Sequence, residues 1–323
     1  MHPSITFAGH FAIDSIIRFQ KEHPPTLGGS VTFGPLALST YTDEVEIRII
    51  SNLGKLNFKA NFLDEFKKSN INLEGVNWTE GKNTNFILEY SNHTRTLTLK
   101  SRSPDIKFKN IPENYLEHPP DALILVPLCC EISLDFISDV LDHFPDALVG
   151  IDLQGFLREI DEDGSVSLAK DEDVREKVDQ IINLIGNHLI LKGSEEEMKI
   201  FFRKEDLVEV MKFFQKYEGL FIMTLGQGGS MIYERGKEIL KIPSFKPEKT
   251  VDETGAGDVY LAIFLYEFLT SNKSWEAIEE AGLRASASAS FLVEHVGPKG
   301  FGSKEDVLER LKKKNYFKFK RDN

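Results

Sequence analysis

The stretch Asp252–Leu269 reads DETGAGDVYLAIFLYEFL, a turn of small residues followed by an apolar helical run. Glycine and alanine at a helix start leave the first backbone N–H groups bare, and the helix dipole adds positive character there. Such a start suits an anion, for example a phosphoryl group in transfer. Asp258 falls in the first helical turn, where a carboxylate is placed to accept the proton of an attacking hydroxyl group. The pattern alone fits a glycine-rich turn with an N-terminal helix acid equally well.

Other phosphate-binding patterns are excluded by the residues present. No Gly-Lys-Ser/Thr follows the turn, so it is not a P-loop, and no third glycine follows Gly257 at the dinucleotide-binding spacing. A second glycine-rich segment, Gly226–Gly229 (GQGG), follows the apolar run Leu220–Leu225. It suits a turn at which the backbone passes close to a ligand, or a plain hairpin turn into Met231–Tyr233.

Short apolar runs alternate with amphipathic helical stretches such as Val174–Ile185 and Glu205–Tyr217. This alternation predicts an α/β fold over residues 1–323, a single domain with a doubly wound, mostly parallel sheet flanked by helices. In such sheets ligands bind beyond the carboxyl ends of the strands. The expected strands are Ile5–Gly9, Glu46–Asn52, Ala122–Pro127, Ala147–Leu153, His188–Lys192 and Leu220–Leu225.

Two segments, 11–29 and 84–101, differ from these runs because polar residues are interleaved among β-forming ones. Within the second, Thr84–Tyr90 and Arg95–Leu99 flank Ser91–Thr94, a predicted hairpin turn. Alternation of this kind means one covered and one exposed face. We expect a small antiparallel sheet that forms a lid over an active site. A hairpin packed permanently on the body fits the pattern equally well.

Composition narrows the function classes. The 51 acidic residues outnumber the 39 basic ones, for a net charge of −12, which argues against nucleic-acid binding. The basic tail Lys312–Arg321 reads as a solvated helix end. Two adjacent cysteines, Cys129 and Cys130, form no ordinary disulfide and fit cytoplasmic life. No signal peptide or membrane span is expected, and the eight scattered histidines predict no structural zinc site.

Together these segments resemble the ribokinase-like (PfkB) family of carbohydrate and nucleoside kinases over nearly the full chain. The resemblance implies a ribokinase-like fold with a small β-sheet lid. The segments that carry it are Asp252 with Thr254–Asp258, Gly28-Gly29 before an expected helix Ser30–Thr40, Gly9–Asp14, Thr224–Gly226 with Gly229, and Ala285–Ser290 with Val293 and Gly297.

The resemblance also implies roles for single residues. Asp258 would be the base, and the backbone amides of Gly255, Ala256 and Gly257 would hold the γ-phosphoryl group of ATP. The residues expected to face substrate hydroxyl groups are Asp14, Gly28 and Gly29. The residues expected to line the nucleotide are Thr224, Gly226, Gly229 and Ser286. Mg²⁺ would bridge the phosphates.

The chain departs from the family at two places. The family's asparagine after the glycine pair is missing from Ser30–Gly34, and its N-x-x-E motif reads Ser194-Glu195-Glu196-Glu197. Glu197 fits the expected Mg²⁺ and phosphate role, whereas Ser194 offers a hydroxyl group in place of an amide's donor and acceptor. The alternative for this acidic trio is the solvated start of a helix capped by Ser194.

Arg158, in Asp152–Arg158 (DLQGFLR), follows an expected strand and lies at the same edge of the sheet. It would stabilise charge on the transferred phosphoryl group, or be a surface arginine. The segments Asn85–Tyr90 and Leu125–Glu131 resemble the archaeal and plant inositol kinase branch, which favours a polyol or sugar such as myo-inositol.

Two further functions stay open. A nucleoside kinase needs an apolar surface for the base, which Phe11, Phe33 and Phe86 would supply. A non-catalytic relative would bind sugar or nucleotide without turnover. Lid strands in this family often pair between subunits, so the resemblance implies that two copies of the chain could form a homodimer through the lid.

Overall fold

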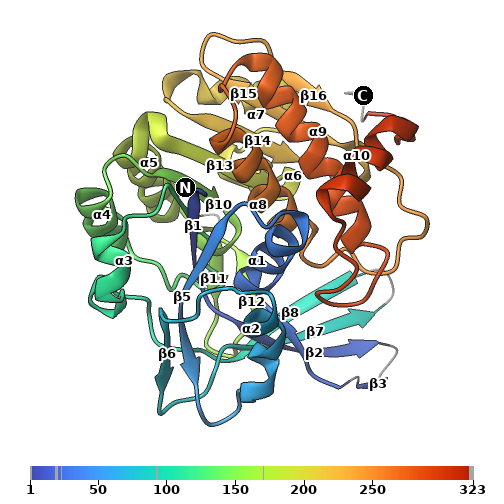
Figure 1. Cartoon of the computed structure of the whole chain (residues 1–323). Helices are drawn as coiled ribbons and strands as arrows, with labels where there is room; N and C mark the ends of the chain where they lie inside the picture. Colours follow the sequence, from blue (N-terminus) through green and yellow to red (C-terminus); the bar gives the residue numbers. More distant parts are fainter. Residues whose placement is uncertain (1, 19–20, 23, 92–93, 170, 320–323) are drawn as a thin grey trace.

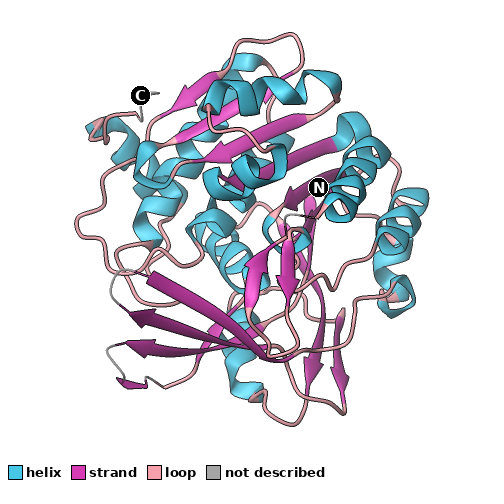
Figure 2. Ribbon diagram, turned by 180° about the vertical axis from the view of Figure 1, so that it is seen from behind, coloured by secondary structure: helices cyan, strands magenta, loops and turns pink. Residues whose placement is uncertain are grey.

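The protein is described by a computed structural model that covers residues 2–18, 21–22, 24–91, 94–169 and 171–319. A large nine-stranded sheet forms its centre, helices cover both faces, and a smaller sheet lies beside it (Figures 1 and 2). The strand order of the large sheet is β16 (Leu240–Ile242), β15 (Ser230–Glu234), β14 (Leu220–Thr224), β13 (Leu189–Ser194), β10 (Leu148–Asp152), β9 (Ala122–Leu125), β1 (Ser4–Ala8), β5 (Glu46–Gly54), β6 (Val76–Thr79).

All strand pairs from β14 to β6 are parallel, and β15 and β16 add antiparallel strands at one edge. Each of the six apolar runs singled out in the sequence is a strand here, with ends shifted by one or two residues. The central strands are mostly apolar because both of their faces are covered. Ala122–Leu125, for example, is buried at every position.

Helices form a layer on each face of the large sheet (Figure 1). One layer holds α1 (Ser30–Tyr41), α8 (Ala256–Leu269), α9 (Trp275–Leu292) and α10 (Lys304–Lys313). The other holds α3 (Glu113–Glu117), α4 (Leu134–His143), α5 (Glu172–Ile185), α6 (Glu195–Phe202) and α7 (Leu207–Phe213). The short helix α2 (Asp64–Lys68) follows β5.

Helix α8 is the centre of its layer. It is apolar on all sides and buried from Val259 to Phe268, because α1, α9 and the sheet all pack against it. The expected helix Ser30–Thr40 is α1, one residue longer. The expectation of a solvated helix end for the basic tail was correct for Lys312 and Lys313, which are exposed at the end of α10. Lys314, with a φ of 48°, ends the helix, and residues 320 and 321 lie outside the described residues.

The smaller sheet contains both segments with interleaved polar residues. Its strands are β3 (Lys21–Glu22), β2 (Ala12–Arg18), β7 (Asn85–Ser91) and β8 (Thr94–Ser101), with β4 (Thr26–Gly28) also on β2. A further two-stranded sheet consists of β11 (Arg158–Ile160) and β12 (Val166–Leu168).

The β7–β8 hairpin was predicted correctly, although residues 92 and 93 of its turn lie outside the described residues. The expectation of a purely antiparallel sheet was wrong, because β2 and β7 pair in parallel. The cause lies in the large sheet. Strands β1 and β6 run parallel and end at the same edge, so the strands that follow each of them leave in the same direction.

A buried carboxylate joins the two sheets. Glu131 Oε1 accepts hydrogen bonds from the backbone N–H of His10 (3.0 Å) and Leu128 (2.9 Å), and Oε2 accepts one from Cys129 N–H (2.8 Å). Burial by itself opposes ionisation, yet the hydrogen bonds from these backbone N–H groups hold the pKa of Glu131 below its usual value. Glu131 therefore fixes the chain after β9 against the chain between β1 and β2.

The ring of His10 extends this junction. Its Nε2 donates to the carbonyl oxygen of Pro104 (3.0 Å), so Nδ1 is the nitrogen that accepts from Thr84 Oγ1 (2.9 Å). Burial lowers the pKa of His10, which keeps the ring neutral. His10, Cys129 and Glu131 bring ligand-type atoms within 4.8 Å of one another, a cluster not foreseen in the sequence. The hydrogen bonds that His10 and Glu131 make indicate that this cluster serves as a structural junction between the two sheets.

We predict that Glu131→Gln lowers the free energy of unfolding by about 3 kcal/mol, because an amide nitrogen would face N–H donors inside the protein. Denaturant unfolding measures the change. The control is Glu309→Gln on the exposed face of α10, which should stay within about 0.5 kcal/mol of wild type. Equal stability of the two variants would contradict the role of Glu131.

Candidate active site

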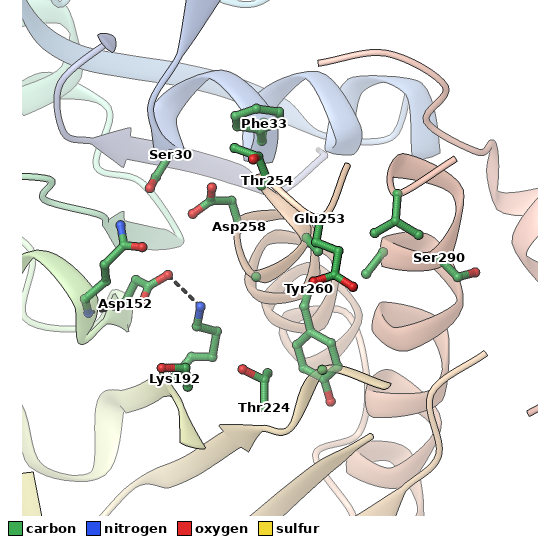
Figure 3. A pocket seen from close by; sticks show the side chains of 18 of the residues that line it. Ser30, Phe33, Asp152, Lys192, Thr224, Glu253, Thr254, Asp258, Tyr260 and Ser290 are labelled. Carbon is green, nitrogen blue, oxygen red and sulfur yellow. Dashed lines mark hydrogen bonds and ion pairs between the residues drawn. The ribbon is translucent and has the colours of Figure 1, made fainter. Parts of the chain in front are cut away.

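A cavity of about 410 Å³ opens at the carboxyl ends of the parallel strands, between the smaller sheet and the start of α8 (Figure 3). Of the residues singled out in the sequence, those that line it are Asp14, Gly29, Arg158, Ser194, Glu197, Thr224, Gly226, Gly229, Gly255, Ala256, Gly257, Asp258 and Ser286. Gly28 lies just behind this lining, where a Cβ atom would come 1.9 Å from Asp14 Oδ2. The structure therefore brings the predicted residues together around one cavity.

Two helices begin at this cavity without a side-chain cap. Most of the longer helices start with a serine or aspartate whose side chain accepts a hydrogen bond from a backbone N–H group, as Ser274 does for α9. Helices α1 and α8 instead start at Gly29 and Gly255, which have φ values of 88° and 84° and offer no cap. No side chain therefore blocks these helix starts from an anion in the cavity, although Ala256 N–H donates to the carbonyl oxygen of Glu253 (3.3 Å) and Thr32 N–H to that of Gly29 (2.9 Å).

The small residues at the start of α8 are required by their neighbours. A Cβ atom on Gly255 would lie 2.3 Å from the ring of Phe33. A Cβ atom on Gly257 would lie 2.5 Å from Lys192 Nζ. The turn therefore packs its bare backbone directly against a lysine, which places a positive charge beside the N–H groups.

That lysine belongs to an ion pair that the sequence analysis missed. Lys192 and Asp152 are register partners at the ends of β13 and β10, and Lys192 Nζ lies 2.6 Å from Asp152 Oδ2 (Figure 3). Both side chains are nearly fully buried. One signal was present in the sequence. Residues alternate between the two faces of a strand, so Lys192 had to share the buried face of Ile190.

Asp258 lies in this charged floor of the cavity. Burial and the charge of Asp152 raise the pKa of Asp258 to about 7, although Lys192, a hydrogen bond from Ser30 and the charge of Arg158 oppose the rise. A carboxyl group with a pKa near neutrality exchanges a proton readily at the pH of cells. Its position in the first turn of α8 was predicted correctly.

Lys192 and Glu197 complete the floor. Burial by itself lowers the pKa of Lys192, but Asp152, Glu197 and Asp258 outweigh it and raise the pKa above its usual value. Burial and the charge of Asp152 raise the pKa of Glu197, against the effect of Lys192. A lysine held in its charged form is thus surrounded by three carboxyl groups.

The Ser194–Glu197 motif forms a capping box at the start of α6. Ser194 Oγ accepts from Glu197 N–H (3.3 Å), and Glu197 Oε2 accepts from Ser194 N–H (2.8 Å). The capping alternative was therefore correct for Ser194. The helix start is solvated only in part, because Glu196 is exposed whereas Glu197 is only 9% exposed and lines the cavity.

Arg158 lies at the cavity and not on the open surface. Its Nη1 donates to the carbonyl oxygen of Leu128 (2.8 Å), and its guanidinium carbon lies 5.7 Å from the centre of the Phe86 ring. These contacts hold a positive charge near Asp258, whose pKa it lowers.

The end of the cavity nearest the smaller sheet is mainly apolar. Strands of that sheet contribute Phe86, Leu88 and Leu97, and Asp14 supplies a carboxylate among them. Phe33 also lines the cavity (Figure 3). The expectation for Phe11 was wrong, because its fully buried ring packs edge-on against Phe66 inside the core.

The other end lies between the β14–β15 turn, the segment after β16, and α9. The hairpin-turn interpretation of Gly226–Gly229 was correct, because the turn joins antiparallel strands, and Gly226 and Gly229 also line the cavity. Thr224 Oγ1 donates to the carbonyl oxygen of Gly193 (3.4 Å). Ser286 Oγ donates to the carbonyl oxygen of Pro243 (2.8 Å), which ties α9 to the segment after β16.

Comparison with known proteins identifies relatives of the chain. Residues 154–304 match the model of the pfkB family carbohydrate kinases. A nucleoside kinase of Methanocaldococcus jannaschii is 39% identical over 106 residues, which cover 32% of this chain and 33% of that protein. The match thus spans about a third of the length of this curated relative.

Solved structures resemble nearly the whole chain. One is a pyrophosphate-dependent kinase in the ribokinase family, complexed with a pyrophosphate analog and myo-inositol, with 20% identity, a TM-score of 0.74 and coverage of 94% of this chain and 99% of that one. Another is a fructokinase from Vibrio cholerae bound to fructose, ADP and calcium, with 16% identity, a TM-score of 0.76 and coverage of 96% and 99%. At these identities the likeness shows the fold.

No helix in the described part of the chain has both the length and the apolar character that a membrane crossing requires.

We predict that Lys192→Met lowers the free energy of unfolding by about 3–5 kcal/mol, because it leaves Asp152 buried without its partner. In the double variant with Asp152→Asn, the loss should fall short of the sum of the single losses by about 1–3 kcal/mol. Denaturant unfolding of the four proteins measures this coupling.

The matched control is the exposed pair of Arg235 and Glu218, whose charged atoms lie 2.7 Å apart. Its cycle, with Arg235→Met and Glu218→Gln, should give a coupling below about 1 kcal/mol. Equal coupling in the two cycles would show that burial adds nothing to the Lys192–Asp152 pair.

Proposed function

We propose that this protein is an enzyme that transfers the γ-phosphoryl group of ATP to a hydroxyl group of a small molecule. The proposal starts from two findings: residues 154–304 match the model of the pfkB family carbohydrate kinases, and the whole chain has the ribokinase-like fold. The observation that carries the proposal is the juxtaposition of Asp258 with the uncapped start of α8. One turn of chain then presents a base and an anion site side by side. A base and an anion site are the two parts that phosphoryl transfer to an alcohol needs.

In this proposal Asp258 accepts the proton of the substrate hydroxyl group as the hydroxyl oxygen bonds to the γ-phosphorus of ATP. The bond from that phosphorus to the bridging oxygen breaks in the same step, and ADP leaves with the electron pair. The backbone N–H groups of Gly255–Gly257 hold the phosphoryl oxygens, and Lys192 and Arg158 stabilise their negative charge. The pKa of Asp258, near 7, is high enough for proton uptake and low enough for the carboxylate to be present at neutral pH.

The donor set of the cavity fits a magnesium ion. Mg²⁺ prefers oxygen ligands from one or two carboxylates together with phosphate oxygens, and Glu197 and Asp152 both line the cavity. These two residues would hold the ion, Glu197 directly or through water. When bound, the ion would neutralise charge on the phosphates.

For the acceptor, we propose a nucleoside ahead of a polyol. The sequence favoured a cyclic polyol such as myo-inositol, which presents hydroxyl groups all round. The end of the cavity at the smaller sheet instead combines one carboxylate, Asp14, with the apolar side chains of Phe86, Leu88 and Leu97. A ribose would place hydroxyl groups at Asp14 while its base covers the apolar wall. The relative from Methanocaldococcus jannaschii supports the same order.

We also propose that the smaller sheet, with segments 11–29 and 84–101, acts as a lid on a single domain. Support comes from its side chains, which line the same cavity as Asp258. A closed lid would exclude water from the transferred phosphoryl group. Pairing of lid strands between two copies of the chain remains a proposal for its oligomeric state.

The proposed base is tested by Asp258→Asn, which keeps size and shape but removes the basic oxygen. We expect kcat to fall by about 10²–10⁴-fold, while the affinity for ATP changes little because the backbone N–H groups remain. Steady-state kinetics and calorimetric titration measure the two effects. Turnover near the wild-type rate would remove Asp258 as the base.

The same variant has a readout independent of activity. The folded-state pKa of Asp258 lies above its unfolded value, so its contribution to stability is lost as pH rises through about 7. Asp258→Asn should therefore melt at a higher temperature than wild type above about pH 8, and this difference should shrink below pH 7. A difference in melting temperature that does not change with pH would argue against the raised pKa.

The pH dependence of kcat/KM should report Asp258. Activity should fall about tenfold per pH unit below a pKa near 7, because the protonated carboxyl group accepts no proton. Lys192→Met should move this acidic fall in kcat/KM to higher pH by about one unit, because the lysine lowers the pKa of Asp258. Asp152→Asn should move it to lower pH, because the charge of Asp152 raises that pKa. Shifts in the same direction for both variants would refute this assignment.

The acceptor is tested with ATP, MgCl₂ and a panel of nucleosides, myo-inositol, ribose and fructose, using coupled detection of ADP. Nucleosides should give the highest kcat/KM. Preference for myo-inositol would overturn the nucleoside assignment and leave the kinase proposal standing. No turnover with any acceptor, together with normal ATP binding, would favour a non-catalytic binding protein.

A further inference from the structure

The segment that follows α10 forms part of the cavity wall. Lys246 N–H donates to the carbonyl oxygen of Asn315 (2.9 Å), and Phe317 N–H donates to that of Ser244 (2.9 Å). Between them Phe245 and Tyr316 pair in an antiparallel bridge, with their ring centres 4.9 Å apart at 72°. Residues 315–317 therefore run as a short extra strand beside residues 244–246, and Phe317 lines the cavity.

These contacts place Phe317 at the end of the cavity away from the smaller sheet. Its partner Ser244 directly follows Pro243, whose carbonyl oxygen accepts the hydrogen bond of Ser286 on α9. Two residues further along, the ring of Phe319 lies 3.2 Å from the position of a Cβ atom on Gly229. The tail thus approaches the β14–β15 turn directly and is linked to α9 through the segment after β16.

The chemistry of this end suits a flat aromatic ligand. Helix α9 contributes only short side chains there, Ser286, Ala289 and Ser290, so the cavity keeps its width. The Phe317 ring is half-buried, and Lys246 Nζ lies 5.6 Å from its centre. An aromatic ring that borders a cavity of this kind offers a stacking surface to a nucleobase.

We propose that Phe317 forms a wall of the base subsite and makes the enzyme select a nucleoside triphosphate over a base-free phosphate donor. This inference rests on the proposed kinase function and adds to it the residue that selects a donor with a base. Proteins of this fold differ in whether the phosphate donor carries a base, because one of the similar structures is a pyrophosphate-dependent kinase. No base needs a wall if the donor is an inorganic phosphate chain.

The test compares two probes, ADP and inorganic tripolyphosphate, each titrated in the presence of MgCl₂ into wild type and variants by calorimetry. Phe317→Ala removes the ring, and Phe317→Tyr keeps it. Lys318→Ala changes the exposed neighbour as a matched control. We expect Phe317→Ala to weaken ADP binding by about tenfold or more, with tripolyphosphate binding and melting temperature unchanged. The other two variants should bind both probes as wild type does.

Three results would overturn the inference and leave the kinase proposal intact. ADP affinity would be unchanged or higher in Phe317→Ala, or both probes would weaken equally as the protein loses stability, or wild type would bind tripolyphosphate as tightly as ADP. A wild-type protein that binds neither probe would refute the kinase proposal and this inference together.

Discussion

The ion pair between Lys192 and Asp152 is the constraint around which the cavity is organised. Two opposite charges held away from water cost several kcal/mol each unless they are closely paired, so the ends of β10 and β13 must stay in register. The lysine in turn leaves no room for a side chain at residue 257. Burial raises the pKa of Asp258, and the excess of negative charge that arises where three carboxyl groups surround one ammonium group adds to this rise.

The two ends of the cavity are built differently. At the smaller sheet, apolar side chains surround one carboxylate, and the wall is made by strands whose polar residues alternate with buried ones. At the other end the wall consists of a glycine turn, short helix side chains and an added strand of tail. Between them lie the bare starts of α1 and α8. A ligand with a flat group at each end and charge in the middle matches this division.

The fold and much of the site could be predicted because their signals are local. Apolar runs predicted six strands, and the small residues of Thr254–Asp258 marked an uncapped helix start beside an acid. The missing parts depend on contacts between distant segments. Asp152 and Lys192 meet only through strand register, and the direction of β7 relative to β2 depends on where β1 and β6 end. The prediction for Phe11 was wrong because an alternating pattern shows that one face of a strand is covered, but not whether the core or the cavity lies on that face.

Asp14 and Phe317 line the same cavity although roughly 300 residues separate them in the chain. A ribosome that adds ~5–20 residues per second needs a quarter of a minute to a minute to cover that distance. During this time β1 and β2 are already outside, but the last wall of the cavity has not been made. A nascent chain therefore has no complete ligand site with which to stabilise its early folding. Binding of a ligand that uses every wall of the cavity helps this protein only after its synthesis has passed residue 317.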